Sequence, residues 1–164
     1  MEKPKSILQV EDDDNDVMFL KLALESAGVT VPLRIAVDGQ EAIDYLSGTA
    51  PFTDRQAYPE PSLVLLDLRI PKIPGLEVLK WIRKQPALKK IPVLVLTSSD
   101  AKRDIEDAYR LGANSYFVKP INPRDLLEIV EHIRDYWLNP SRKKLEVPDS
   151  LSRFLKRPMV ETFR

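Results

Sequence analysis

The segment LVLLDLRIPKIPG, residues 63–75, contains both a buried strand and the point at which that strand must end. The run LVLL is apolar on both sides, which is typical of a central strand in a parallel sheet. Asp67 follows directly, and Pro71, Pro74 and Gly75 then favour a turn over any continuation of the strand. A carboxylate is therefore placed at the tip of a buried strand, a position that suits a chemically active group.

The same order of a short apolar run followed by an amphipathic segment occurs five times along the chain. Strands are predicted at 6–10, 33–37, 62–66, 92–98 and 115–118, and helices at 15–28, 39–48, 76–85, 101–112 and 123–138. This alternation predicts an α/β fold, with a doubly wound parallel sheet covered by helices on both faces. Ligands of such sheets bind beyond the carboxyl ends of the strands.

Composition indicates a soluble protein and excludes several kinds of chemistry. The 164 residues are 43% hydrophobic and carry 25 basic and 25 acidic side chains. Because there is no cysteine, disulfides and thiolate catalysis are excluded. No apolar run approaches the roughly 18 residues of a membrane helix, and the N-terminus has no signal-peptide pattern, so we expect a cytoplasmic protein.

Polar side chains follow four of the five predicted strands. Glu11 and Asp12 follow the first strand, Asp67 the third, Thr97 the fourth and Lys119 the fifth. If the strands are parallel, these groups converge at one edge of the sheet. Taken singly, each has a structural explanation; Asp12 or Asp13, for example, could simply cap the first helix.

The converging groups form a set suited to phosphoryl transfer. Clustered carboxylates repel one another, and a divalent cation relieves that repulsion. Oxygen ligands alone favour Mg²⁺, which also binds phosphate oxygens. Within such a cluster an aspartate can act as the nucleophile that forms an aspartyl-phosphate, while Lys119 and Thr97 stabilise the transferred group.

Four motifs resemble the receiver domain of two-component response regulators over about residues 5–138. They are VEDD, LLDLRIPKIPG, VLTSS and YFVKP, in the family's order and spacing. The resemblance implies a flavodoxin-like (βα)5 fold with strand order 2-1-3-4-5, a receiver domain at 1–138, and a C-terminal tail or dimerisation arm at 139–164. A dehalogenase-type phosphatase also uses a strand-end aspartate, but needs a second acid where this chain has Arg69.

The resemblance also implies a role for each matching position. Asp67 would be the phosphoacceptor, helped by Lys119 and Thr97, and the switch would combine Thr97 with Tyr116. The Mg²⁺ ligands would be Glu11, Asp12, Asp67 and the backbone carbonyl of Arg69, and the peptide between Lys119 and Pro120 would be cis.

Two departures from the common pattern flank the expected phosphorylation site. Arg69 lies two residues after Asp67, and Ser99 lies two residues after Thr97. In the family these positions flank the path of the hydrolytic water. We therefore expect Arg69 to alter the lifetime of the phosphorylated state; an arginine merely exposed to solvent is the alternative. Pro74, where the family often has aspartate, should have little chemical effect.

The expected function is that of a single-domain response regulator that signals by association. Only 26 residues follow Leu138, too few for a DNA-binding domain. The family does not act as an enzyme beyond catalysing its own phosphorylation and dephosphorylation. The long region TAPFTDRQAYPEPSLVLLDLRIPK and the helix end DYWL most resemble regulators paired with phytochrome histidine kinases. Expected partners are thus such a kinase, a histidine phosphotransfer protein and a second copy.

The tail and the loop 49–61 leave alternatives open. Seven basic and three acidic residues follow Leu138, giving the tail a charge of +4. Its apolar residues would enlarge a dimer interface, and 149–157 could form a short amphipathic helix. Binding to nucleic acid or membranes through SRKKLE and RFLKR is a competing hypothesis that we do not favour, and a non-phosphorylated scaffold is another. The loop is either a variable surface loop or a partner-binding one.

Overall fold

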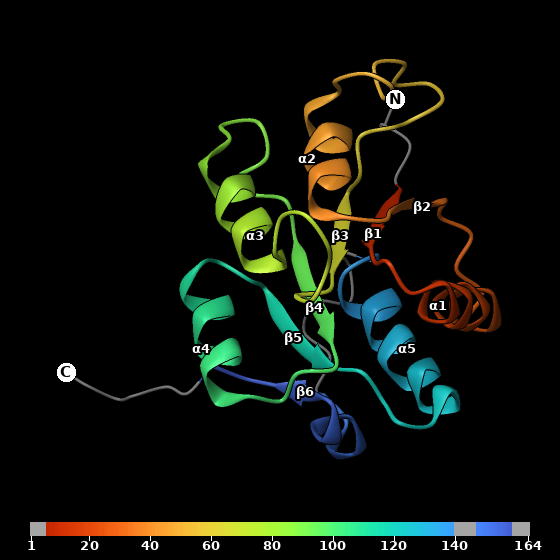
Figure 1. The fold of residues 1–164 in the computed structure, drawn as a ribbon. Coiled ribbons are helices and arrows are strands. Elements are labelled where there is room, and N and C mark those ends of the chain that lie inside the picture. The colour runs from red at the N-terminus through yellow and green to blue at the C-terminus, as the bar shows by residue number, and fades with distance from the viewer. Residues whose placement is uncertain (1–5, 140–146, 159–164) are drawn as a thin grey trace.

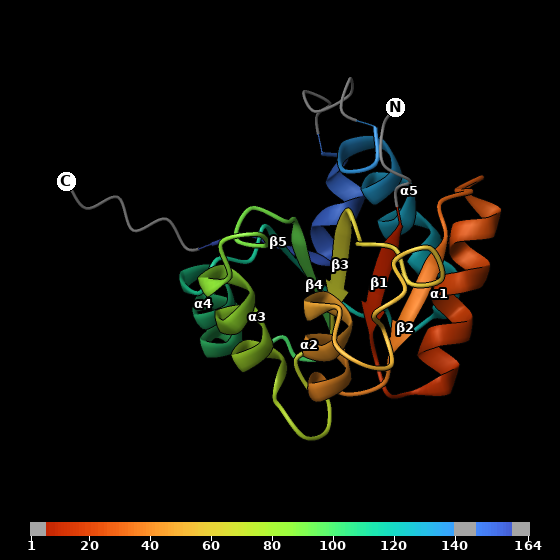
Figure 2. The ribbon, with the colours of Figure 1, turned by 90° about the horizontal axis from the view of Figure 1, so that it is seen from above.

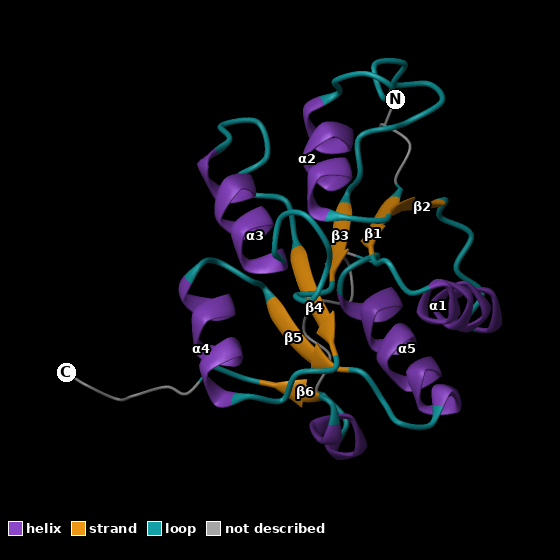
Figure 3. Cartoon of the chain, in the orientation of Figure 1, coloured by secondary structure: helices purple, strands orange, loops and turns teal. Residues whose placement is uncertain are grey.

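The computed structural model describes residues 6–139 and 147–158 as one six-stranded sheet with helices on both faces (Figure 1). The helices and strands alternate along the chain as the apolar periodicity predicts (Figure 3). Their bounds are β1 Ile7–Val10, α1 Asp14–Ser26, β2 Leu33–Ala36, α2 Gly39–Ser47, β3 Leu63–Leu66, α3 Gly75–Lys84, β4 Val93–Thr97, α4 Lys102–Arg110, β5 Ser115–Val118, a 3-10 turn Pro123–Asp125, α5 Leu126–Tyr136, a 3-10 turn Asp149–Arg153, and β6 Leu155–Lys156.

The strand order β2-β1-β3-β4-β5-β6 confirms the expected doubly wound sheet. The first five strands are parallel, and β1 lies between β2 and β3, so that Ile7 pairs with both Leu33 and Leu63. The chain therefore winds first toward one edge of the sheet and then toward the other. That reversal places the carboxyl ends of β1 and β3 side by side, where a binding site is expected.

Helices cover both faces of the sheet (Figure 2). An apolar core lies between the sheet and the helices on each face. Because side chains alternate across a strand, Val64 and Leu66 pack toward α2, α3 and α4, while Leu63 and Leu65 pack toward α1 and α5. All four of these β3 side chains are at most 1% exposed. A strand buried on both faces explains why LVLL is apolar throughout.

The C-terminal segment adds a sixth strand to the sheet. Here the expected helix over 149–157 is wrong in its second half: a 3-10 turn covers Asp149–Arg153, and β6 then pairs antiparallel with β5. The amide of Val118 donates to the carbonyl of Phe154 across this edge. The open edge of β5 offers backbone hydrogen bonds, and a helix of so few residues is not stable by itself.

Apolar side chains of this segment are buried within the chain. Leu151 is 0% exposed and Phe154 is 9% exposed, and both belong to the core shared with α1 and α5. For these two residues, packing against a second copy is therefore replaced by packing against the chain's own core. Other apolar residues of the expected arm, namely Leu145, Met159, Val160 and Phe163, lie outside the described residues.

The loop 49–61 is anchored to α2 by an aromatic cluster and an arginine. The ring centroid of Tyr45 lies 5.1 Å from that of Phe52 and 6.1 Å from that of Tyr58. Arg55 donates hydrogen bonds to the carbonyls of Tyr45 and Leu46 at the end of α2. These contacts give the length and composition of the loop a structural explanation.

No helix in residues 6–139 or 147–158 combines the length and apolarity of a bilayer-spanning segment.

Candidate functional site

Three carboxylates surround the amino group of Lys119, immediately after β5. Lys119 Nζ lies 2.6 Å from Glu11 Oε1, 2.7 Å from Asp16 Oδ2 and 2.7 Å from Asp67 Oδ2. The side chains of Glu11 and Asp67 are 3% and 7% exposed, and that of Lys119 is 14% exposed. The sheet edge therefore brings three of the expected residues together in a nearly dry site.

Burial and neighbouring charges shift the pKa values of Glu11 and Lys119 in this cluster. Burial raises the pKa of Glu11 to about 7; the hydrogen bond from Lys119 opposes the rise, and the charge of Asp67 adds to it. Burial alone would lower the pKa of Lys119, but its hydrogen bonds to Asp16, Asp67 and Glu11 outweigh burial and raise that pKa. Lys119 is thus held as a cation, and one cation serves three acids.

Asp67 is held by its backbone and by both carboxylate oxygens. Its amide donates to the carbonyl of Val10 on β1. The hydroxyl of Thr97 donates to Asp67 Oδ1 at 2.7 Å, and the amide of Arg69 donates to the same oxygen at 3.1 Å. Together with Lys119 on Oδ2, these donors bind both carboxylate oxygens and fix the orientation of the Asp67 side chain.

The turn that follows Asp67 depends on a glycine at the start of α3. The amide of Gly75 donates to the carbonyl of Leu68 at 3.0 Å. A Cβ atom at position 75 would lie 2.4 Å from the carbonyl oxygen of Asp67 and 2.6 Å from Cα of Leu68. Neither contact is sterically allowed, so only glycine lets α3 begin so close to the strand tip.

We therefore expect Gly75→Ala to destabilise the fold by roughly 1–3 kcal/mol and to shift the backbone at Asp67. Urea unfolding measures the first effect, and amide NMR shifts at residues 67–69 measure the second. Gly28→Ala is a suitable control, because a Cβ there meets nothing within 4 Å and only the positive φ of 74° is strained. Unchanged shifts at residues 67–69 in Gly75→Ala would contradict the close-packing argument.

Of the two expected switch residues, Thr97 binds Asp67, whereas Tyr116 is buried and binds the loop after β4. Tyr116 is 0% exposed, and its hydroxyl donates to the carbonyl of Ser99 at 2.8 Å. Burial raises the pKa of Tyr116 to about 12. Tyr116 is therefore not an exposed tyrosine at the sheet edge, while its switching role stays a prediction.

The expected arrangement of metal ligands is met only in part. Asp12 is exposed, and Asp13 caps α1 by accepting from the amides of Asn15 and Asp16. The cap explains how Asp16, which sequence reasoning missed, reaches Lys119 from the first turn of α1. Within the described residues no group of three or more His, Cys, Asp or Glu side chains is arranged to hold a metal ion. The carboxylates of Glu11 and Asp67 both bind Lys119 instead.

The expected cis peptide before Pro120 is also wrong. In the described part of the chain the cis peptide bond joins Ala50 and Pro51. The Lys119–Pro120 peptide has the trans form, which is intrinsically favoured even before proline.

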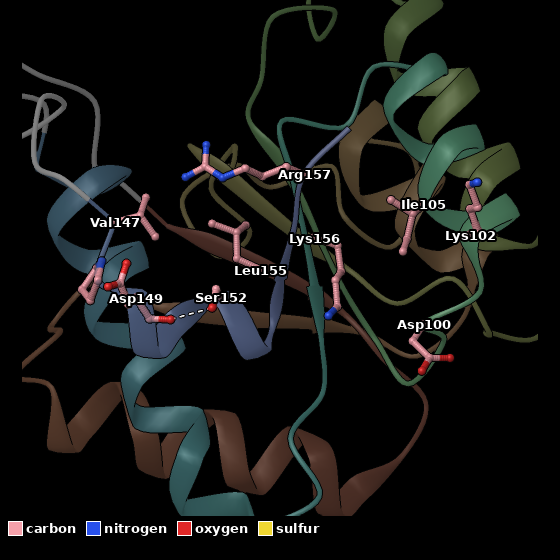
Figure 4. A pocket seen from close by; sticks show the side chains of 10 residues that line it. Asp100, Lys102, Ile105, Val147, Asp149, Ser152, Leu155, Lys156 and Arg157 are labelled. Atoms are coloured by element: carbon pink, nitrogen blue, oxygen red, sulfur yellow. Dashed lines mark hydrogen bonds between the residues drawn. The ribbon is translucent and has the colours of Figure 1, made fainter. Parts of the chain in front are cut away.

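A pocket of about 510 Å³ lies between α4 and the C-terminal segment, away from the strand-end residues (Figure 4). Asp100, Lys102 and Ile105 project from the α4 side, whereas Leu155 and Lys156 project from β6. Charges of both signs line it, and none of the site residues at the strand ends does. We therefore assign the candidate site to the strand ends and not to this pocket.

A parallel sheet of this order with an aspartate, lysine and threonine at its carboxyl edge defines a receiver domain. The chain matches the family model of the response regulator receiver domain over residues 7–131. It therefore belongs to the response regulator receiver family.

Two curated relatives are similar to this chain over most of its length. The chain is 40% identical to the probable methanogenesis regulatory protein FilR2 of Methanothrix harundinacea, over 86% of this chain and 88% of FilR2. It is 38% identical to response regulator Rcp1 of Synechocystis sp., over 82% and 90% of the two chains.

Solved structures of response regulators are also similar to this chain. The Mn²⁺-bound form of Rcp1 matches with a TM-score of 0.75 and 36% identity, covering 88% of this chain and 99% of Rcp1. The phosphorylated cyanobacterial phytochrome response regulator RcpA matches with a TM-score of 0.77 and 38% identity, covering 83% and 95%.

Proposed function

We propose that this chain is a phosphorylation-dependent response regulator that accepts a phosphoryl group on Asp67 from a histidine kinase. The observation that carries the proposal is the arrangement around Asp67, with Lys119 on one carboxylate oxygen and Thr97 on the other. The relative RcpA, which is described as phosphorylated, supports it.

Asp67, Lys119 and Thr97 each have a separate role in the proposed phosphoryl transfer. A carboxylate oxygen of Asp67 attacks phosphorus, and the bond from phosphorus to the donor's leaving group breaks. Lys119, whose raised pKa keeps it charged, neutralises negative charge that develops on the transferred group. Thr97 is placed to exchange its bond to Asp67 for one to a phosphoryl oxygen.

The donor atoms fit a hard divalent cation by their chemistry, although in the described residues the carboxylates are arranged around Lys119 and not as metal ligands. Glu11, Asp12, Asp67 and the carbonyl of Arg69 offer only oxygen, and the cluster carries more negative than positive charge. These groups would hold Mg²⁺, which would supply positive charge beside the phosphoryl oxygens. The Mn²⁺-bound form of the relative Rcp1 supports a divalent site.

We propose that phosphorylation changes which proteins this chain binds. We propose that a phosphoryl group that captures the Thr97 hydroxyl also alters the position of Tyr116, because the two residues lie on the paired strands β4 and β5. Tyr116 in turn lies next to α4. We propose that partners, among them a second copy, read the surface formed by α4, β5 and α5, part of which β6 covers. The phytochrome regulator RcpA makes a phytochrome-type kinase our proposed donor.

Phosphotransfer from a purified kinase tests this function. A phytochrome histidine kinase, first autophosphorylated with radiolabelled ATP, should pass its label to this chain with Mg²⁺ present but not with EDTA. A kinase-specific transfer that also changes the sedimentation of the chain would support the proposed output. No transfer from any kinase or small donor, with folding verified, would instead indicate a scaffold that is not phosphorylated.

A further inference from the structure

Arg69 forms an ion pair across the mouth of the site with the first turn of α4. Its guanidinium Nη2 lies 3.7 Å from Asp104 Oδ2, and the two side chains are 70% and 30% exposed. The backbone amide of the same arginine donates to Asp67. One residue therefore touches the expected phosphoacceptor through its backbone and α4 through its side chain.

Asp104 also connects the ion pair to the switch residues. The hydroxyl of Ser99 donates to Asp104 Oδ2, and the same hydroxyl accepts from the amide of Ala101. The carbonyl of Ser99 accepts the hydroxyl of Tyr116. The carboxylate of Asp104 thus joins the loop after β3, the loop after β4 and the start of α4.

A phosphoryl group on Asp67 would compete with Asp104 for the arginine. It carries a charge near −2 with several strong acceptor oxygens, whereas Asp104 carries at most one negative charge. The ion pair between Arg69 and Asp104 is largely exposed and therefore weak. An arginine that is only two residues from the phosphoacceptor and weakly held can change partner at little cost.

We propose that Asp104 is a positioning residue that restrains Arg69, and that Arg69 moves to the phosphoryl group and prolongs its lifetime. The inference rests on the proposed function, since it needs a phosphoryl group on Asp67. In hydrolysis, water oxygen attacks phosphorus, the bond from phosphorus to Asp67 breaks, and the carboxylate keeps that electron pair. The proton of the water passes to phosphate or solvent. A guanidinium bound to phosphoryl oxygens covers the approach of this water.

Movement of the Arg69 side chain to the phosphoryl group would also change the contacts of α4. Once the guanidinium leaves, Asp104 keeps only its bond from Ser99 among these contacts. The first turn of α4 then loses its ion pair with the loop after β3. A local charge change at the site would in this way alter the surface that partners read.

A double-mutant cycle on dephosphorylation tests the inference. The chain is phosphorylated with acetyl phosphate and Mg²⁺, the donor is removed, and the first-order loss of the label is followed. Asp104→Asn frees Arg69 and should slow the loss roughly two- to five-fold, the range that a weak exposed ion pair allows. Arg69→Ala keeps the backbone carbonyl but should speed the loss by a similar factor.

The double variant separates positioning from a structural effect. If Asp104 acts through Arg69, the double variant should lose its label at the rate of Arg69→Ala alone. Asp104→Glu should restore the rate of the unmodified chain. Asp107→Asn is the matched control, because Asp107 pairs with Arg103 and Arg110 on the same helix and should change nothing.

Two results would overturn the inference. One is an unchanged rate in Asp104→Asn, and the other is slower loss in the double variant than in Arg69→Ala. Both require that the unmodified chain takes up label. A chain that takes up no label from acetyl phosphate or from a kinase would refute the proposed function instead.

Discussion

Replacing Lys119 with methionine is expected to lower the free energy of unfolding by about 3 kcal/mol at neutral pH, because it leaves buried carboxylates without their cation. Glu11 and Asp67 are nearly buried, and both bind this one amino group. Methionine keeps most of the apolar stem of lysine, so the loss reports on charge more than on packing. Phosphorylation of Asp67 should be lost as well.

The pH dependence of this variant has a definite sign. Burial already raises the folded-state pKa of Glu11 to about 7, and without the opposing hydrogen bond from Lys119 this pKa rises further above its unfolded value. Groups of this kind favour the folded state at low pH and lose that contribution as pH rises. The difference in stability between the variant and the unmodified chain should therefore shrink as pH falls from about 8 to about 5.

Urea unfolding over that pH range measures the effect, with the exposed Lys80→Met as control. A variant as stable as the unmodified chain at pH 8 would mean that water already solvates the carboxylates.

Truncation of Leu151 or Phe154 to alanine is expected to destabilise the whole domain, although both residues lie far along the C-terminal segment. Cavities left by buried leucine or phenylalanine cost about 2–5 kcal/mol. Leu151 is 0% exposed and Phe154 is 9% exposed, and both pack with residues of α1 and α5. The segment should then leave the edge of β5, since only a two-residue strand pairs there.

Urea unfolding and hydrogen exchange at the amide of Val118, which donates to Phe154, measure these two effects. Ser152→Ala in the same turn is the control, because that side chain is exposed. If Leu151→Ala and Phe154→Ala are as stable as this control, the segment does not contribute to the core.

The parallel fold was predictable because the apolar pattern allowed few alternatives. A run such as LVLL, apolar on both sides, fits only a strand covered by helices on both faces. Parallel strands in turn bring their carboxyl ends to one edge, so the meeting of Glu11, Asp67, Thr97 and Lys119 followed from alternation and topology.

The missed features depend on contacts between distant segments. The strand at Leu155–Lys156 forms because β5 has an open edge, and a short segment does not reveal which edge it will join. Asp16 reaches Lys119 because Asp13 caps α1 and sets the phase of the first turn. Asp104 lies on α4, whose sequence indicates only an amphipathic helix. The position of Asp104 in the sequence does not indicate that it pairs with Arg69.

The most direct test of the proposed function is to locate the phosphoryl group. The chain is incubated with acetyl phosphate and Mg²⁺, and its intact mass and proteolytic fragments are then compared with those of Asp67→Asn. Asp54→Asn, an exposed aspartate of the loop 49–61, is the matched control. We expect one phosphoryl group on the fragment that contains Asp67, present in the control and absent from Asp67→Asn and from samples with EDTA. A phosphoryl group that persists in Asp67→Asn, or one found on another fragment, would contradict the assignment of Asp67 as the phosphoacceptor.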